Sequence, residues 1–296
     1  FLCPVPGYDR HFSVTESFGI KMIPVKMLET GPDMAEVKRL VESDDSIKGI
    51  WCCPIYSNPE GVVYSDETVI AFANLRPKAV DFKIFWDNAY IVHYFGEAPA
   101  NIPNIIEECK KAGNPNMVYE FVSTSKISFP GAGVAAMAGS ITVVEEIKKQ
   151  MFAQTIGPNK LNQLAHVRYF KNKDGVMAQM KLFADILRPK FQLVFNTLES
   201  ELKDTGIIKW KNPQGGYFVS VDVMEGTAKR VVDLAKSAGV VLTGAGSTYP
   251  YKDDPYDSNI RLAPTYPPLD ELRLAMEIFV VAVKLAAVEK LLQKKQ

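Results

Sequence analysis

The alternation of strand-like and helix-like segments in the first half constrains the fold more than any other feature of this sequence. Short apolar runs, which predict buried strands, alternate with amphipathic stretches of helical period. Strands separated by helices predict an α/β fold, with a mostly parallel sheet, right-handed crossovers and helices on both faces. The expected strands are residues 21–27, 47–53, 83–87 and 117–122, and the expected helices are residues 9–18, 33–42, 65–75 and 105–112.

The second half has a different pattern, which predicts a smaller C-terminal α+β domain. Long helical stretches come first, and Pro189 is expected to kink the longest of them or to begin a new helix. The boundary between the domains is expected within this helical region, so we predict a large domain over residues 1–195 and a small one over 196–296. The expected helices are residues 140–152, 158–170, 174–202, 227–238 and 269–292, and the expected strands are residues 217–223, 240–243 and 259–262.

Composition excludes several classes of function. The 296 residues are 47% hydrophobic and 23% charged, which is typical of a globular protein with ample material for a core. The 34 basic residues balance the 34 acidic ones, so no excess of positive charge indicates a nucleic acid or an anionic membrane as partner. No apolar run approaches the ~18 residues of a membrane span, and no signal peptide is recognisable. The four cysteines show no metal-ligand spacing; we expect them to be reduced, in a cytoplasmic protein without a metal site.

Three of the expected strands end in residues with useful chemistry. Ligands of open parallel sheets bind beyond the carboxyl ends of the strands, so these residues are candidates for one site. A lysine amine there is a candidate nucleophile that forms a Schiff base, and pyridoxal phosphate needs such a lysine together with a carboxylate at its pyridine nitrogen. The three stretches are Asn58-Pro59-Glu60-Gly61, Asp87-Asn88-Ala89-Tyr90 and Ser123-Thr124-Ser125-Lys126.

These stretches, in this order, resemble the aspartate-aminotransferase-like enzymes of fold type I, which use pyridoxal phosphate. They match the Asn-Pro-x-Gly, Asp-x-x-Tyr and Ser-x-Ser-Lys elements of that family, and residues 259–262 match the late strand that carries its carboxylate-binding arginine. The subgroup with the SKI-x-FPGAGV variant is the most similar. The resemblance covers the whole chain and implies transfer of an amino group between an amino acid, aspartate by preference, and a 2-oxo acid such as 2-oxoglutarate. It also implies a ping-pong mechanism and a homodimer.

The resemblance assigns a role to each matching residue. The implied roles are Lys126 for the Schiff base and proton transfer, Asp87 for the pyridinium nitrogen, Asn58 and Tyr90 for the ring oxygen, Ser123 for the phosphate, Tyr8 for stacking on the ring, His11 for support behind Asp87, and Arg261 for the substrate α-carboxylate. Asn58 is also expected to bind substrate, and Ser125 is expected to help bind the phosphate.

Two departures from the family pattern stand out. Gly133 lies near the position at which the family has an arginine that binds the phosphate. The chain also begins in an apolar run at Phe1, so we expect the N-terminal part of the family's large domain to be missing from it.

Three alternative functions remain open at this point. A lyase on the same scaffold would share the lysine chemistry. A non-catalytic, aminotransferase-like sensor module would share the cofactor. Residues 123–126 also match the Ser-x-x-Lys motif of penicillin-recognising hydrolases, but Pro130 and Gly131 exclude the long helix that those enzymes have after this lysine.

Overall fold

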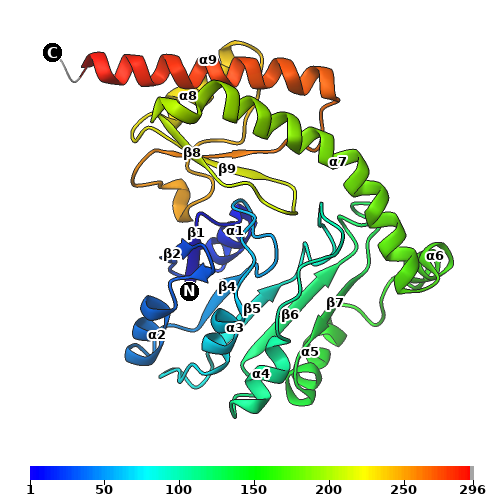
Figure 1. The fold of residues 1–296 in the computed structure, drawn as a ribbon. Helices are drawn as coiled ribbons and strands as arrows, with labels where there is room; N and C mark the ends of the chain where they lie inside the picture. The colour runs from blue at the N-terminus through cyan, green and yellow to red at the C-terminus, as the bar shows by residue number, and fades with distance from the viewer. Residues whose placement is uncertain (294–296) are drawn as a thin grey trace. The chain divides into compact units, whose positions relative to one another are not determined.

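The computed structural model describes residues 1–293 and confirms the alternation of strands and helices in the first half (Figure 1). Every element expected there forms within a few residues of its predicted bounds. The strands are β1 (Leu2–Val5), β2 (Ile23–Leu28), β3 (Gly31–Pro32), β4 (Gly49–Cys52), β5 (Lys83–Asp87), β6 (Val118–Ser123) and β7 (Ala135–Ala138). The helices are α1 (Asp9–Ser17), α2 (Met34–Ser43), α3 (Asp66–Ala73) and α4 (Ile105–Lys111).

The seven strands form one sheet in the order β3-β2-β1-β4-β5-β6-β7. The central pairs β1–β4, β4–β5 and β5–β6 are parallel, whereas β2–β3 and β6–β7 are antiparallel. The predicted α/β class with a mostly parallel sheet is therefore confirmed. The strand at residues 117–122 was expected to be buried. β6 is only partly buried, and Val122 is 39% exposed.

An aromatic core fixes the end of β5. The Trp86 ring is buried and lies edge-on to Phe72 and Tyr64, with ring centroids 5.8 and 5.7 Å away. Complete burial of a large apolar side chain stabilises the fold by roughly 1.5–3 kcal/mol. Because Asp87 directly follows Trp86, the core also determines where this carboxylate lies.

The N-caps of α3 and α1 differ. The Ser65 hydroxyl accepts a hydrogen bond from the Thr68 amide, as expected of an N-cap. Asp9 is the first helical residue of α1 and not its cap. Tyr8 occupies the N-cap position and makes no capping bond through its side chain. The carboxylate of Asp9 is thus available for another partner.

The second half contains long helices and a three-stranded sheet. The sheet order is β10-β9-β8, with antiparallel pairing throughout. The prediction of a strand at residues 240–243 was wrong, because no strand forms there. Pro189 lies inside α7 and neither ends this helix nor begins a new one. The elements are α5 (Ile141–Gln154), α6 (Lys160–Phe170), α7 (Lys173–Leu202), η1 (Lys203–Thr205), β8 (Ile208–Trp210), β9 (Val219–Val223), α8 (Ala228–Ser237), η2 (Pro250–Lys252), β10 (Asn259–Leu262) and α9 (Leu269–Gln293).

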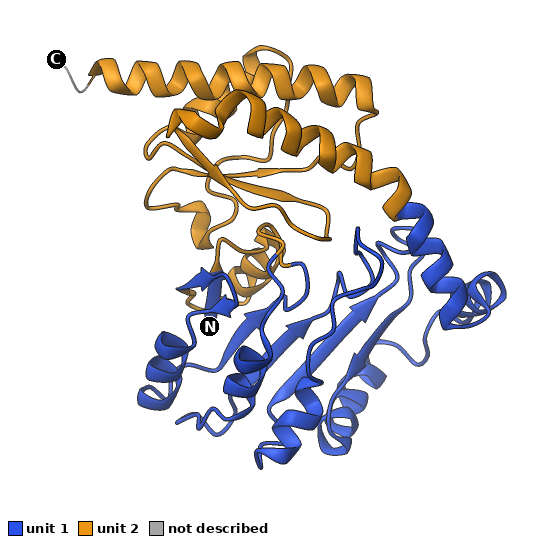
Figure 2. Ribbon diagram, in the orientation of Figure 1, with its two compact units in different colours: residues 1–4, 25–56, 62–183 blue, residues 5–24, 57–61, 184–296 orange. Residues whose placement is uncertain are grey.

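The chain packs as two compact units (Figure 2). Unit 1 comprises residues 1–4, 25–56 and 62–183, and unit 2 comprises residues 5–24, 57–61 and 184–296. Unit 2 therefore includes two early segments besides the C-terminal part. The division at residue 195 into large and small folding domains stays a prediction.

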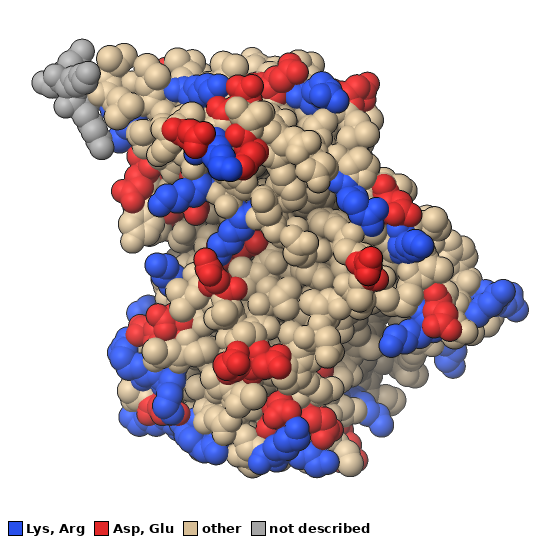
Figure 3. Space-filling view, in the orientation of Figure 1, with Lys and Arg blue, Asp and Glu red and all other residues tan. Residues whose placement is uncertain are grey.

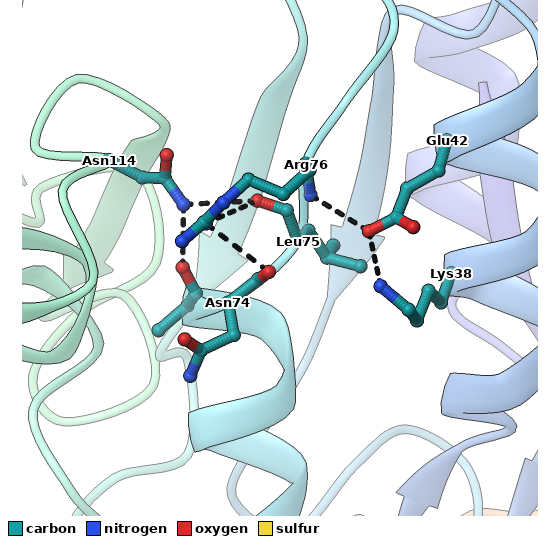
Figure 4. A network of polar contacts seen from close by, with 7 residues as sticks. Lys38, Glu42, Asn74, Leu75, Arg76 and Asn114 are labelled. Carbon is teal, nitrogen blue, oxygen red and sulfur yellow. Dashed lines mark hydrogen bonds and ion pairs between the residues drawn. The ribbon is translucent and has the colours of Figure 1, made fainter.

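A polar network at the carboxyl end of α3 stabilises unit 1 (Figure 4). Asn114 Nδ2 donates to the carbonyl oxygens of Ala73 and Leu75, at 2.8 and 3.0 Å. The backbone amide of Arg76 donates to Glu42, which connects this turn to α2. Carbonyl groups at a helix end have no partner within the helix, so these side chains supply the missing hydrogen bonds.

Replacing Asn114 with alanine should therefore destabilise unit 1 by about 1–2 kcal/mol, because two carbonyl groups lose a donor. The measurement is the midpoint of urea unfolding. Asn101→Ala, at an exposed position of the same unit, is the control and should change stability by less than about 0.5 kcal/mol. An Asn114→Ala midpoint equal to that of the control would contradict the role of Asn114.

Basic and acidic side chains intermingle over the face seen in Figure 3. This distribution agrees with the zero net charge of the sequence. Among residues 1–293, no helix is long and apolar enough to cross a membrane.

Candidate active site

Lys126 lies on the loop that connects β6 to β7 in unit 1. The two strands pair from Glu120 opposite Ala138 to Ser123 opposite Ala135, so the loop comprises residues 124–134. The Lys126 amine lies over the ring of Tyr90, with Nζ 4.9 Å from the ring centroid. The structure thus brings together two of the predicted site residues, which are far apart in sequence.

Contacts from α6 and α7 support this loop. Ile127 packs with Phe170 and Met180 in a small buried cluster. His166 Nδ1 donates to the Asn162 carbonyl at 2.7 Å, and its Nε2 lies within hydrogen-bond distance of the hydroxyls of Ser128 and Thr124, at 2.7 and 2.9 Å. Apolar and polar contacts on both sides of Lys126 therefore fix the backbone that carries it.

His93 is a residue of this group that the sequence analysis missed. Its Nε2 lies 3.1 Å from the Lys126 carbonyl oxygen, and its ring lies edge-on to Tyr90 at 5.6 Å. Burial lowers the pKa of His93 to about 4, so the ring is neutral near neutral pH and Nε2–H donates to that carbonyl. The only signal in the sequence was its position three residues after Tyr90.

Asp87 occupies the last position of β5, opposite Phe121 of β6, and is half-buried. The next residue, Asn88, donates from Nδ2 to Glu120. Burial raises the pKa of the Glu120 carboxyl, and the hydrogen bond from Asn88 opposes that rise. The strand end thus holds Asp87 between a buried tryptophan and a partly buried polar pair.

Ser123, Ser125 and Gly133 lie close together on the β6–β7 loop. The Ser125 amide lies 3.4 Å from the Ser123 hydroxyl. A Cβ atom at Gly133 would come within 3.1 Å of both the amide nitrogen and the hydroxyl of Ser125. A side chain at position 133, including an arginine, would crowd Ser125. This close approach gives a physical reason for the glycine.

Arg261 belongs to unit 2 and is nearly buried in the centre of β10. Its Nη1 donates to Asp9 Oδ1 at 2.8 Å and to Asn58 Oδ1 at 3.1 Å. The guanidinium carbon lies 4.9 Å from the centroid of the Phe218 ring. An acidic, an amide and an aromatic side chain therefore contact one guanidinium group.

The remaining predicted residues also belong to unit 2. Asn58 is 3% exposed, and its Nδ2 has no hydrogen-bond acceptor within residues 1–293. Tyr8 and His11 pack edge to face, with ring centroids 5.0 Å apart. The predicted residues therefore form two groups, one in each unit: Lys126, Tyr90, Asp87, Ser123 and Ser125 in unit 1, and Arg261, Asn58, Tyr8 and His11 in unit 2.

These residues fit pyridoxal phosphate. The buried Asn58 Nδ2 is a donor that still needs an acceptor such as the ring oxygen of the cofactor. The absence of a side chain at Gly133 avoids a close contact with the amide and hydroxyl of Ser125, which are donors of the kind that bind a phosphate. Within residues 1–293, no cluster of three or more His, Cys, Asp or Glu side chains could hold a metal ion.

Comparison with known proteins identifies the family. The family model described as aspartate amino-transferase matches residues 1–295. The chain belongs to this family. A protein of Mycolicibacterium smegmatis named as a candidate aminotransferase is 48% identical over 100% of this chain and 69% of its own length. The crystal structure of an aspartate transaminase from Corynebacterium glutamicum superposes with a TM-score of 0.96 at 46% identity, covering 98% of this chain and 68% of that one.

A more distant structure shows the same fold. The α-aminoadipate aminotransferase of Thermus thermophilus, complexed with N-(5′-phosphopyridoxyl)-L-leucine, superposes with a TM-score of 0.82 at 20% identity, over 97% of this chain and 71% of that one. The predicted fold type and enzyme class are thus confirmed: the chain is an aminotransferase of fold type I. Residues 123–126 of this aminotransferase end a strand and enter a loop, so they are not the helix start of a penicillin-recognising hydrolase.

Proposed function

We propose that this chain is a pyridoxal-phosphate-dependent aminotransferase that moves an amino group between aspartate and a 2-oxo acid, 2-oxoglutarate by preference. The observation that carries the proposal is the buried guanidinium of Arg261, which Asn58 and Phe218 orient from two sides. A planar guanidinium matches a carboxylate in a bidentate pair. Amino acids and 2-oxo acids share an α-carboxylate, so one arginine serves both half-reactions.

Lys126 is the residue that holds the cofactor covalently and moves a proton at the substrate Cα. Bound pyridoxal phosphate supplies an electron sink for the pair of electrons left when that proton departs. The loop contacts of Lys126 restrict its backbone, so its amine has a limited set of positions above Tyr90. A restricted base transfers a proton faster because less orientation entropy is lost in the transition state.

Other residues bind and orient. Asp87 provides the negative charge for the pyridinium nitrogen, and Asn58 and Tyr90 donate to the ring oxygen. Ser123 and Ser125 bind the phosphate with neighbouring amide groups. In unit 2, Tyr8 provides an aromatic face and His11 packs against its edge. We further propose a homodimer in the cytoplasm, on the basis of family membership alone.

Borohydride reduction of the cofactor-loaded protein, followed by peptide mapping, should place the label on Lys126. Reduction makes the bond between lysine and cofactor permanent, so the labelled peptide reports the attachment site directly. Lys190, a buried lysine whose amine donates to the Thr265 carbonyl, should remain unlabelled and serves as the internal control. Label on a lysine other than Lys126 would refute the assignment.

Product analysis tests the reaction itself. The loaded protein is mixed with aspartate and 2-oxoglutarate, and the products are separated and identified. Formation of a new amino acid, with initial rates that give parallel double-reciprocal lines, supports transamination by a ping-pong route. Ammonia or a cleaved side chain would instead show a lyase on this scaffold.

A further inference from the structure

The one charged partner of Arg261 within the described chain is Asp9, and nothing in the proposed reaction uses it. Its Oδ1 lies 2.8 Å from Arg261 Nη1, across 252 residues of sequence. The side chain of Asp9 is 45% exposed, whereas that of Arg261 is only 9% exposed. A carboxylate at the edge of the solvent thus neutralises a nearly buried cation.

Asp9 is not needed to orient the guanidinium. Asn58 Oδ1 accepts from the same Nη1, and the ring of Phe218 lies against the guanidinium plane. These two neutral groups contact both the edge and the face of the guanidinium plane of Arg261. Asp9 is not needed as a cap for α1 either, because the cap position belongs to Tyr8. What Asp9 adds is a negative charge at the arginine.

Resting on the proposed function, we propose that Asp9 is a specificity-determining residue that occupies Arg261 as an internal carboxylate. An incoming α-carboxylate either displaces the Asp9 carboxylate from Arg261 Nη1 or is repelled by the negative charge of Asp9. Two like charges on one guanidinium weaken binding in a low-dielectric site. A simple anion is therefore held weakly. A substrate that also reacts with the lysine-bound cofactor has a second source of binding free energy and is retained.

The direction of the effect distinguishes this role from a structural one. If Asp9 competes with ligands, Asp9→Asn tightens carboxylate binding, because the amide oxygen still accepts from Arg261 but carries no charge. If Asp9 only holds Arg261 in place, the same change leaves affinity unchanged or weakens it. The probe is succinate, a dicarboxylate without an amino group, so binding is measured by calorimetry on the cofactor-loaded protein without turnover.

Asp9→Asn should bind succinate about tenfold more tightly than the wild type. Asp270→Asn is the matched control, since Asp270 is also an exposed acid in the first turn of a helix of unit 2. Its succinate affinity should stay within about twofold of the wild type. Thermal unfolding of each variant verifies that unit 2 is folded.

A double-mutant cycle locates the effect. In an Arg261→Gln background, Asp9→Asn should no longer change succinate affinity, because the shared partner has gone. Unchanged or weaker binding by the single Asp9→Asn variant overturns the inference, as does the absence of succinate binding in both this variant and the wild type. These results are separable from the proposed function. If the protein does not transaminate but the double-mutant cycle gives the expected succinate affinities, the proposed reaction is wrong and the proposed role of Asp9 stands.

Discussion

Replacing Asp87 with asparagine is expected to reduce turnover by about three orders of magnitude, or about 4 kcal/mol of transition-state stabilisation. A neutral amide cannot hold the proton on the pyridine nitrogen, so the cofactor loses its strength as an electron sink. Asparagine has nearly the same shape as aspartate, and Trp86 and the pairing with Phe121 still fix the strand end. The variant should therefore fold and still bind the cofactor.

The measurement is kcat for transamination of the proposed substrate pair, together with the absorbance of the bound cofactor. Asp81→Asn is the matched control: Asp81 lies two residues before β5, is exposed, and pairs with Lys48 on the surface. This control should retain wild-type turnover, because exposed ion pairs contribute little. Turnover of Asp87→Asn within tenfold of the wild type would remove Asp87 from the mechanism.

Arg261→Lys is expected to weaken binding of both the amino acid and the 2-oxo acid by roughly 2–5 kcal/mol each. An ammonium group cannot reproduce the planar fork that matches a carboxylate, and it loses the stacking on Phe218. Lys126 and Asp87 are unchanged, so the absorbance of the cofactor-loaded protein without substrate should stay nearly the same. The measurement is KM for each substrate in steady-state kinetics.

Arg230→Lys is the control for this substitution. Arg230 makes two hydrogen bonds to one carboxylate, that of Glu289, and it is exposed on α8 of the same unit. The control should leave both KM values unchanged. Normal affinity of Arg261→Lys for both substrates would make Arg261 a structural residue only.

Local patterns predicted the strand ends well. Lys83–Asp87 forms a strand with the expected bounds, because an apolar run followed by polar residues leaves few alternatives for a buried strand. The Lys126 loop and the arginine strand were found through motifs whose residues are adjacent in sequence. These features depend mainly on neighbours along the chain, and a single sequence contains that information.

Features that depend on distant partners were missed or wrong. Residues 240–243 are apolar or β-branched, as is typical of a strand, but they join neither edge of the three-stranded sheet β10-β9-β8. His93 gains its role from the Lys126 carbonyl, 33 residues away. Asp9 is a residue type common at helix N-caps and lies at the start of α1. Only the folded chain shows that its partner is Arg261. Hydrogen-bonding capacity can be read from a sequence, whereas the choice among distant partners cannot.

The composition of unit 2 has a consequence for biosynthesis. Its early segments, residues 5–24 and 57–61, leave the ribosome long before residues 184–296. Asp9 and Arg261 are 252 residues apart, which corresponds to about 13–50 s of translation at about 5–20 residues per second. During that interval, α1, whose Phe12 is buried in the folded chain, lacks its contacts with η2 of the C-terminal part. We expect a nascent chain stalled before residue 184 to recruit chaperones through this helix, and a chain released after β10 to lose that association.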